Sequence, residues 1–358
     1  MRQIQVRSPA NRTANRLVLG LFPSFDEIGG VQTSGQIAWN AVCATEGTAG
    51  YLHSYRAAGV GASPLRGLAR ASAVLRTVCA PGPADLALIW HLDLLKLVPF
   101  LLRRPRRIAV YLHGVEAWRP QSRLISAQLP LVSSFLCNSH ETWVRFQASN
   151  SQVECSSHAI VHLGTGSPII GSTPTPLGPP AALMLSRLDR REDYKGHREM
   201  ITAWPRVLED IPNAQLWIAG GGDLLPDLRA LTTSLPNGSV RFFGQVSNEA
   251  RDRLLAHCRC VALPSRGEGF GLIYLEAMRF GRPCLVSTLD AGREVVNPPE
   301  AGLAVDPSNP EQIAVAIRSL LSGDAWPNWS RRARQRYESS FTARHFQERL
   351  VAALHLAT

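Results

Sequence analysis

The chain has 358 residues, which is long for one domain and favours two. About 45% of the residues are hydrophobic and 18% are charged, so the composition excludes a disordered or fibrous protein. The net charge of +10 predicts a surface that attracts phosphorylated substrates or other polyanions, and the seven cysteines lack the spacing of a disulfide framework, which favours a reduced compartment.

The N-terminal segment, residues 1–16, is polar and rich in arginine, and it lacks the apolar core of a signal peptide. We therefore expect a cytoplasmic protein. The apolar stretch Leu94–Leu102 is too short to span a bilayer and leads into an arginine cluster over residues 103–107. That cluster fits either a solvated basic face or peripheral contact with the inner face of an anionic membrane, and we expect no nucleic-acid partner.

Five short apolar runs in the first half of the chain predict buried strands. They cover residues 17–22, 86–90, 108–112, 131–137 and 159–163. Each run ends in polar residues or glycine, and helix-like segments lie between several of them. This alternation predicts a parallel sheet with helices on both faces, which is a Rossmann-like α/β domain over residues 1–165.

Residues 166–181 are rich in proline and glycine and predict a linker, after which the alternation starts again. We expect a second doubly wound, Rossmann-like domain over residues 182–340, and a last helix within 341–358 that packs on one of the two domains, the N-terminal one being a candidate. Its predicted strands cover 182–186, 215–219, 240–243, 260–263 and 283–287, and its predicted helices cover 196–209, 224–234, 248–257 and 271–280. Two such domains create a cleft at the carboxyl ends of their strands, where ligands bind.

The segment from Pro264 to Pro283 follows a strand, crosses a glycine-rich turn and enters a helix. Backbone N–H groups and the helix dipole at such a start suit a phosphate group. Glu276 is the only carboxylate among apolar residues of that helix, and the hydroxyl groups of a ribose are suitable donors to it. Glu268 lies in the turn, where sugar hydroxyls are plausible partners. Taken alone, Glu276 fits a helix-flank residue equally well, and Glu268 fits an ordinary loop residue better.

This segment resembles the signature of glycosyltransferase family 4. The matching order is Pro-Ser-x-x-Glu-Gly-Phe-Gly, a second Glu separated from the first by seven residues, and then Ala-Met-x-x-Gly-x-Pro. The resemblance implies the GT-B fold, with two facing Rossmann-like domains and a central cleft, and sugar transfer with retention of anomeric configuration. It also implies a donor-binding role for Gly269, Phe270, Gly271 and Glu276, and a catalytic role for Glu268.

Other segments resemble the same family in the same order along the chain. Gly29 and Gly30 resemble the loop that approaches the donor diphosphate, although a Gly-Gly pair alone usually marks a turn. His113 resembles the imidazole beside the transferred sugar, although a lone histidine is more often structural. The resemblance further implies that Arg187 and Lys195 bind the diphosphate, against the alternative of a solvated charged loop, and that Val246 lies near the base.

The resemblance implies a retaining hexosyltransferase that uses a UDP- or GDP-sugar and a saccharide or lipid-linked saccharide acceptor, in bacterial cell-surface polysaccharide or glycolipid synthesis. The N-terminal domain would hold the acceptor and the second domain the donor. The chain has no Asp-x-Asp motif, so we expect neither a metal nor another cofactor. A sugar-nucleotide epimerase, a disaccharide phosphorylase and a catalytically silent nucleotide-sugar or polyanion-binding protein remain alternatives on the same fold.

Overall fold

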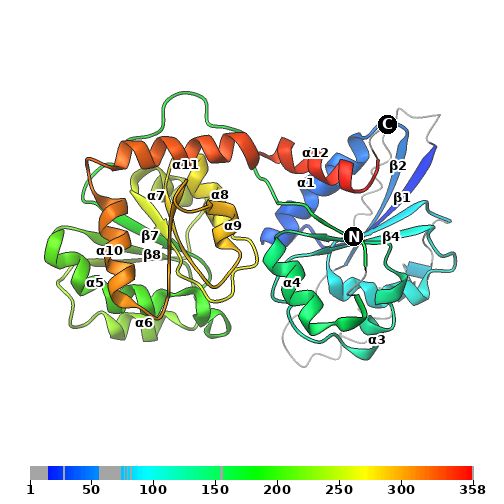
Figure 1. Ribbon diagram of the computed structural model, residues 1–358, viewed down its shortest axis with the longest axis horizontal. Coiled ribbons are helices and arrows are strands. Elements are labelled where there is room, and N and C mark those ends of the chain that lie inside the picture. Colours follow the sequence, from blue (N-terminus) through cyan, green and yellow to red (C-terminus); the bar gives the residue numbers. More distant parts are fainter. Residues whose placement is uncertain are drawn as a thin grey trace. The chain divides into compact units, whose positions relative to one another are not determined.

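The computed structural model describes residues 15–26, 29–55, 83–153 and 156–356, together with residues 74, 75, 77, 78 and 80. It divides into two compact units (Figure 1). Unit 1 comprises Met1–Thr165 and Ala343–Thr358, and unit 2 comprises Gly166–Thr342. Each unit is built on a parallel sheet of six strands.

The sheet of unit 1 has the strand order β2-β1-β3-β4-β5-β6. Its strands are β1 (Arg16–Pro23), β2 (Thr48–Tyr55), β3 (Leu86–Ile89), β4 (Arg107–Leu112), β5 (Ser134–Cys137) and β6 (His158–Ile160). All five predicted strands are present, but the one expected over 131–137 is shorter, because Leu129–Leu131 forms a 3-10 turn before it. Strand β2 was not predicted, since most of its residues are only half-buried at the sheet edge and carry no apolar run.

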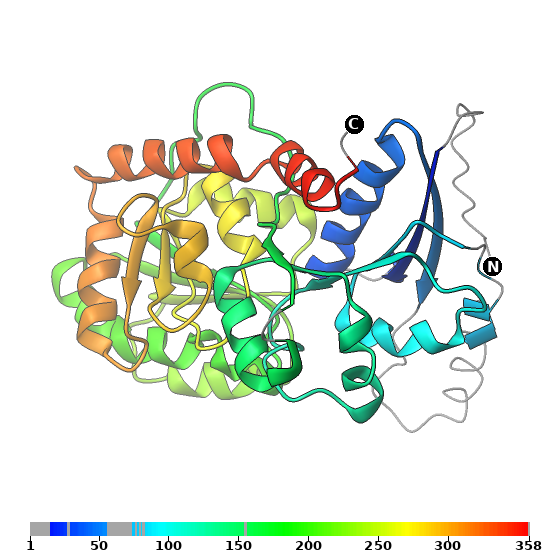
Figure 2. The ribbon, with the colours of Figure 1, turned by 45° about the vertical axis from the view of Figure 1, so that its right-hand side comes forward.

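The helices of unit 1 cover the sheet, and the C-terminal helix is one of them. Those whose bounds the structure describes are α1 (Gly30–Ala44), η1 (Leu92–Phe100), α3 (Arg123–Ser126), η2 (Leu129–Leu131), α4 (His140–Ser149), η3 (Ser151–Val153) and α12 (Ala343–Ala353). Helix α12 packs along α1, as Figure 2 shows, and Arg349 donates a hydrogen bond to the His162 carbonyl at 3.0 Å. The apolar stretch near residue 94 forms η1, and no helix among the described residues is long and apolar enough to cross a bilayer.

Unit 2 has the strand order β12-β11-β10-β7-β8-β9. Its strands are β7 (Ala181–Leu185), β8 (Gln215–Ala219), β9 (Val240–Gly244), β10 (Cys260–Ala262), β11 (Cys284–Ser287) and β12 (Gly302–Val305). The five predicted strands are confirmed, and β12 is an additional edge strand. The chain passes from β9 at one edge back to β10 beside β7, so the order reverses between β7 and β10, which is where ligands bind in doubly wound sheets.

The helices of unit 2 lie on both faces of its sheet (Figure 1). They are η4 (Arg190–Lys195), α5 (His197–Asp210), α6 (Leu225–Leu231), α7 (Asn248–His257), α8 (Leu272–Arg279), α9 (Gly292–Val296), α10 (Pro310–Leu321) and α11 (Trp326–Ser340). Helix α5 packs against α6 and α10 on one face, and α8 packs against α9 and α11 on the other. The predicted helix over 248–257 coincides with α7.

The segment predicted as a linker is held by arginines of unit 2. Arg279, Arg282 and Arg334 donate hydrogen bonds to its backbone carbonyl groups, at 2.8 Å to Ser167, 2.5 Å to Pro174 and 2.7 Å to Gly171. Because guanidinium groups supply several donors in a fixed plane, they satisfy backbone oxygens that proline-rich chain cannot pair within itself. This segment is therefore part of unit 2.

Candidate active site

His113 follows β4 at the carboxyl end of the sheet in unit 1. Its Nε2 atom lies 2.6 Å from the Trp90 carbonyl oxygen, which can only accept, so Nε2 carries the proton of the neutral ring. Burial lowers the pKa of His113 to about 4, although Glu116 nearby acts in the opposite direction. The ring is therefore neutral at pH 7 and offers Nδ1 as a hydrogen-bond acceptor, which suits a sugar hydroxyl.

Trp90 connects His113 with the predicted glycine loop. Its indole Nε1 donates to the Val31 carbonyl at 3.0 Å, one residue after Gly30. Gly30 is the first residue of α1, and Gly29 caps that helix in an extended conformation. The structure thus brings Gly29, Gly30 and His113 into one region of unit 1, with the first-turn amides of α1 beside them.

Two further polar side chains fix the backbone at the carboxyl ends of β4 and β5. Glu116 accepts hydrogen bonds from the backbone N–H groups of His113 and Gly114, at 2.6 and 3.2 Å. Asn138, which follows β5, donates to the His113 carbonyl at 2.6 Å. These contacts hold the backbone of His113 from both sides, so its ring position is set by the fold.

In unit 2, Lys195 and Glu268 meet between two loops that are far apart in sequence. The Lys195 Nζ atom lies 3.5 Å from Oε2 of Glu268 and 3.5 Å from Oε2 of Glu192. Burial lowers the pKa of Lys195, but the two carboxylates outweigh it and raise the pKa overall. Lys195 is therefore a fixed, charged ammonium group, and only 16% of its side chain is exposed.

Arg187 follows β7 at the carboxyl end of the sheet, and 76% of its side chain is exposed. It pairs with Glu192, the same carboxylate that contacts Lys195. Glu192 of the charged loop is thus the counter-ion of Arg187 and Lys195, the two side chains predicted to bind the diphosphate. A diphosphate group carries more charge and more acceptor oxygens than one carboxylate, so it can replace Glu192 there.

The glycine-rich turn before α8 packs tightly at its end. Gly271 has φ +88 and caps the helix, and a Cβ atom there would lie 2.3 Å from the Tyr274 ring. Phe270 is 3% exposed and its ring packs against Phe341. The Phe270 side chain is therefore part of the core, so a ligand at this turn would meet backbone groups near Gly269 and the first-turn amides of α8.

Asp290 holds the turn that carries Glu268. One carboxylate oxygen accepts the Glu268 N–H at 3.1 Å, and the other accepts the Gly292 N–H at 3.0 Å. The Glu268 carbonyl in turn accepts the Ala291 N–H at 3.1 Å. Asp290 is fully buried, and this burial raises its pKa to about 7 despite the hydrogen bonds that favour the ionised form.

The raised pKa of Asp290 predicts opposite pH trends for activity and stability. Ionised Asp290 accepts both N–H groups, so kcat/KM should rise about tenfold as pH increases through about 7. Stability should change the other way, because a carboxyl with a raised folded-state pKa stabilises the fold below about pH 4 and loses that contribution as pH rises to about 7. Asp290→Asn should flatten both trends, as measured by pH profiles of rate and melting temperature. An unchanged acid limb in Asp290→Asn would contradict this role.

Glu276 lies on α8 with 28% of its side chain exposed, and burial raises its pKa. Its Oε1 atom lies 3.5 Å from Nη1 of Arg251 on α7, which acts against the rise. Arg251 also contacts Asp252 at 3.1 Å, so it is shared between two carboxylates. Glu276 thus keeps acceptor capacity for a pair of hydroxyl groups.

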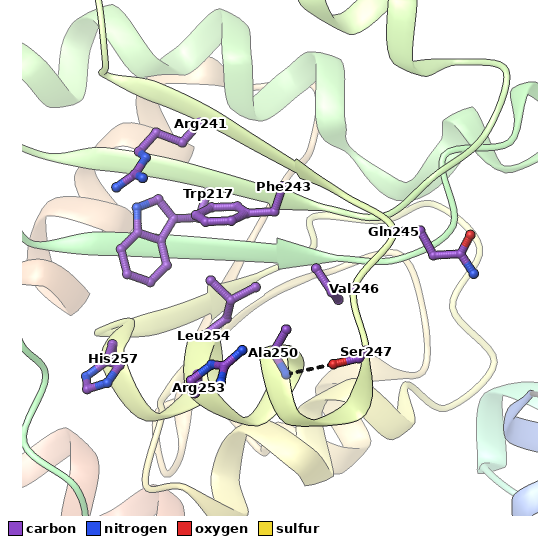
Figure 3. A pocket seen from close by; sticks show the side chains of 10 residues that line it. All are labelled: Trp217, Arg241, Phe243, Gln245, Val246, Ser247, Ala250, Arg253, Leu254 and His257. Atoms are coloured by element: carbon purple, nitrogen blue, oxygen red, sulfur yellow. Dashed lines mark hydrogen bonds between the residues drawn. The ribbon is translucent and has the colours of Figure 1, made fainter.

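Val246 follows β9 and lies at one end of an open groove of about 460 Å³ between β8, β9 and α7 (Figure 3). Phe243 and Gln245 belong to the same segment as Val246, which resembles the one near the nucleotide base, and the other residues that line the groove were not predicted from the sequence. These others are Trp217, Arg241, Ser247, Ala250, Arg253, Leu254 and His257.

The predicted site residues form two groups. Gly29, Gly30 and His113 lie in unit 1, whereas the other eight lie in unit 2, where contacts join Arg187, Lys195 and Glu268. In the part of the chain that the structure describes, no three His, Cys, Asp or Glu side chains are arranged to hold a metal ion. Metal independence stays a prediction.

Sequence reasoning missed five residues that complete these groups: Trp90, Glu116, Glu192, Arg251 and Asp290. Trp90, Arg251 and Asp290 contact residues that are 22 or more positions away. Glu116 accepts from backbone N–H groups. None of these four belongs to a local motif. Glu192 lies in the charged loop between Arg187 and Lys195. Its spacing from Arg187 and Lys195 is the one signal that could have assigned it as their counter-ion.

Comparisons with known proteins identify the family that unit 2 resembles. Residues 179–323 match the family model described as glycosyl transferases group 1. A phosphatidyl-myo-inositol mannosyltransferase of Mycobacterium leprae is 34% identical over 143 residues, which are 40% of this chain and 37% of that protein. An uncharacterised glycosyltransferase of Methanocaldococcus jannaschii is 36% identical over 140 residues, 39% of this chain and 36% of that protein. The chain thus matches little more than a third of the length of these relatives.

Solved structures match over nearly the whole chain. Anabaena HepE in complex with UDP and glucose superposes with a TM-score of 0.71 and 18% identity, over 95% of this chain and 99% of that one. Sucrose-phosphate synthase from Thermosynechococcus elongatus gives a TM-score of 0.74 and 18% identity, over 95% and 98%. Residues 179–323 thus belong to the group 1 glycosyltransferases, and the likeness to these solved structures shows that the chain has the GT-B fold.

Proposed function

We propose that the chain is a retaining hexosyltransferase that moves a sugar from UDP or GDP to a saccharide or lipid-linked saccharide. We propose that this reaction takes place on the cytoplasmic side of a membrane, in cell-surface polysaccharide or glycolipid synthesis. The name of the mannosyltransferase relative supports a lipid-linked acceptor. The UDP and glucose bound to HepE support a nucleotide-sugar donor.

One observation carries the proposal most directly. Lys195 is largely shielded from water beside Glu268, which lies in the glycine-rich turn before α8, and Glu192 joins Lys195 to Arg187. Two cations and a helix start are the groups that bind a diphosphate in proteins. A surface ion-pair network does not need a lysine that is largely buried, which disfavours the alternative of a solvated charged loop.

In the proposed reaction, an acceptor hydroxyl attacks the anomeric carbon as the bond to the nucleoside diphosphate breaks. Lys195 and Arg187 stabilise the negative charge that develops on the leaving phosphate. The hydroxyl proton passes to that phosphate on the same face of the sugar, which retains the configuration. In this proposal Glu276 accepts from the ribose and His113 Nδ1 accepts from a sugar hydroxyl, so both serve positioning.

Product analysis separates the proposal from its alternatives on the same fold. An epimerase needs only the donor and a phosphorylase needs free phosphate, whereas a transferase needs an acceptor. A catalytically silent binding protein would bind the donor and release no nucleoside diphosphate. The neutral, acceptor-type His113 and the Lys195 cluster favour catalysis over silent binding.

Glu276→Ala is expected to weaken binding of the nucleotide sugar about 10- to 100-fold, because two charge-assisted hydrogen bonds to ribose are lost. Calorimetry against a panel of UDP- and GDP-sugars measures this, and hydrolysis and transfer assays with the best binder follow. Glu311→Ala is a suitable control, since that glutamate is exposed on α10 and pairs with Arg206. Equal affinity of Glu276→Ala and the wild type would remove the ribose assignment, and no binding to any nucleotide sugar would remove the proposed function.

A further inference from the structure

The groove between β8, β9 and α7 has an apolar wall that the proposed reaction does not use. Trp217 and Phe243 form one side with their rings edge to face, 5.7 Å between centroids (Figure 3). The indole N–H already donates to Gln215 at 2.9 Å, so this side presents carbon surface. Leu254 and Ala250 of α7 form the opposite side. An apolar chain or ring system is the matching ligand body.

The rim of the groove is basic. The Arg241 guanidinium lies 5.4 Å from the centroid of the Phe243 ring, and Arg253 and His257 line the groove from α7. None of the residues that line the groove is acidic. An acidic neighbour of Arg253 is Glu249, one turn before it on α7, whose pKa is lowered by a hydrogen bond with Ser247 and further by Arg253. Charge complementarity therefore favours an anionic group at this rim.

We propose that this groove binds a lipid phosphate of a membrane surface, with its apolar chain between Trp217 and Leu254 and its phosphate on Arg241 and Arg253. Each methylene group that leaves water for such a wall adds to the binding, and a short soluble anion lacks this contribution. The volume of about 460 Å³ lies within the range of small-molecule sites. This proposal concerns unit 2 alone and does not rest on the proposed transferase activity.

Decyl phosphate, kept below its critical micelle concentration, is the probe, and calorimetry measures its binding to the full chain. We expect binding at one site, weakened at least about tenfold by Arg241→Ala combined with Arg253→Ala. Ala250→Trp should abolish binding by filling the groove. Arg229→Ala is the matched control, because Arg229 stacks over the neighbouring Phe242 and does not line the groove; its affinity should equal that of the wild type.

Three results of the calorimetry would overturn the proposal. The first is equal affinity for decyl maltoside, which has no charge. The second is unchanged binding in the double arginine variant, whose exposed positions should not affect folding. The third is displacement of decyl phosphate by UDP or GDP, which would make the groove part of the donor site. Co-sedimentation with phosphatidylcholine vesicles that contain phosphatidic acid tests the source of the phosphate. Salt-sensitive binding that the double variant loses supports a membrane lipid, whereas binding of free decyl phosphate alone would overturn the membrane assignment.

Discussion

Lys195→Ala is expected to lower kcat/KM for sugar transfer by about 10²- to 10³-fold, which is typical when one donor to a developing negative charge is removed. The structure gives the physical reason. Lys195 is held by Glu192 and Glu268 at 3.5 Å each and is mostly shielded from water, so its charge acts in a medium that screens it poorly. Most of the loss should appear in kcat, because the charge on the diphosphate grows as the glycosidic bond breaks.

The chain provides its own control for this experiment. It has only two lysines, and Lys96 lies exposed on η1 in unit 1. Lys96→Ala should retain wild-type kcat and KM. Lys195→Arg should recover only part of the activity, since a planar guanidinium does not fit between two carboxylates as an ammonium group does. Wild-type kcat/KM in Lys195→Ala would place the diphosphate elsewhere.

Glu268→Ala is expected to reduce kcat by about 10²-fold, because the loss of this carboxylate shifts Lys195 and removes an acceptor for the sugar hydroxyls. Glu268→Gln keeps the acceptor oxygen but not the charge, so its rate should lie between those of Glu268→Ala and the wild type. Glu338→Ala on α11 serves as the control, since Glu338 pairs with Arg334 at 2.7 Å. Steady-state kinetics with the preferred donor measures these effects.

Combination of the two changes tests whether Lys195 and Glu268 act together. Residues in direct contact give non-additive effects, so the double Ala variant should be little worse than Lys195→Ala alone. Strictly additive losses would mean that the two side chains act independently. Glu268 would then have no role through Lys195.

The sequence predicted most of the fold because apolar runs mark buried strands. Strand β8 and helix α7 begin and end where the pattern indicated. Strand β2 was missed because its half-buried edge residues leave no apolar run. Strand β12 was also missed, although its sequence Gly-Leu-Ala-Val is apolar. The proline- and glycine-rich segment was predicted as a linker from composition alone, and composition does not show the arginines of α8 and α11 that fix it.

The candidate site was predictable where its residues follow strands, begin a helix or match the family resemblance. Arg187, His113 and the turn around Glu268 have such positions, so local pattern and resemblance could find them. Asp290 acts on Glu268 across 22 residues and Arg251 acts on Glu276 between two helices, and tertiary packing alone creates these contacts. The sequence also named Phe270 without indicating that its ring packs against Phe341 in the core.

Protection of Lys195 from acylation tests the central claim, which is that unit 2 binds a nucleotide diphosphate sugar through this side chain. Both lysines can be followed by peptide mass spectrometry after brief treatment with an amine-specific acetylating reagent. At a donor concentration about ten times Kd, Lys195 should react about tenfold more slowly while Lys96 reacts at an unchanged rate. An unchanged rate at Lys195, with the same donor shown by calorimetry to be bound, would contradict the account.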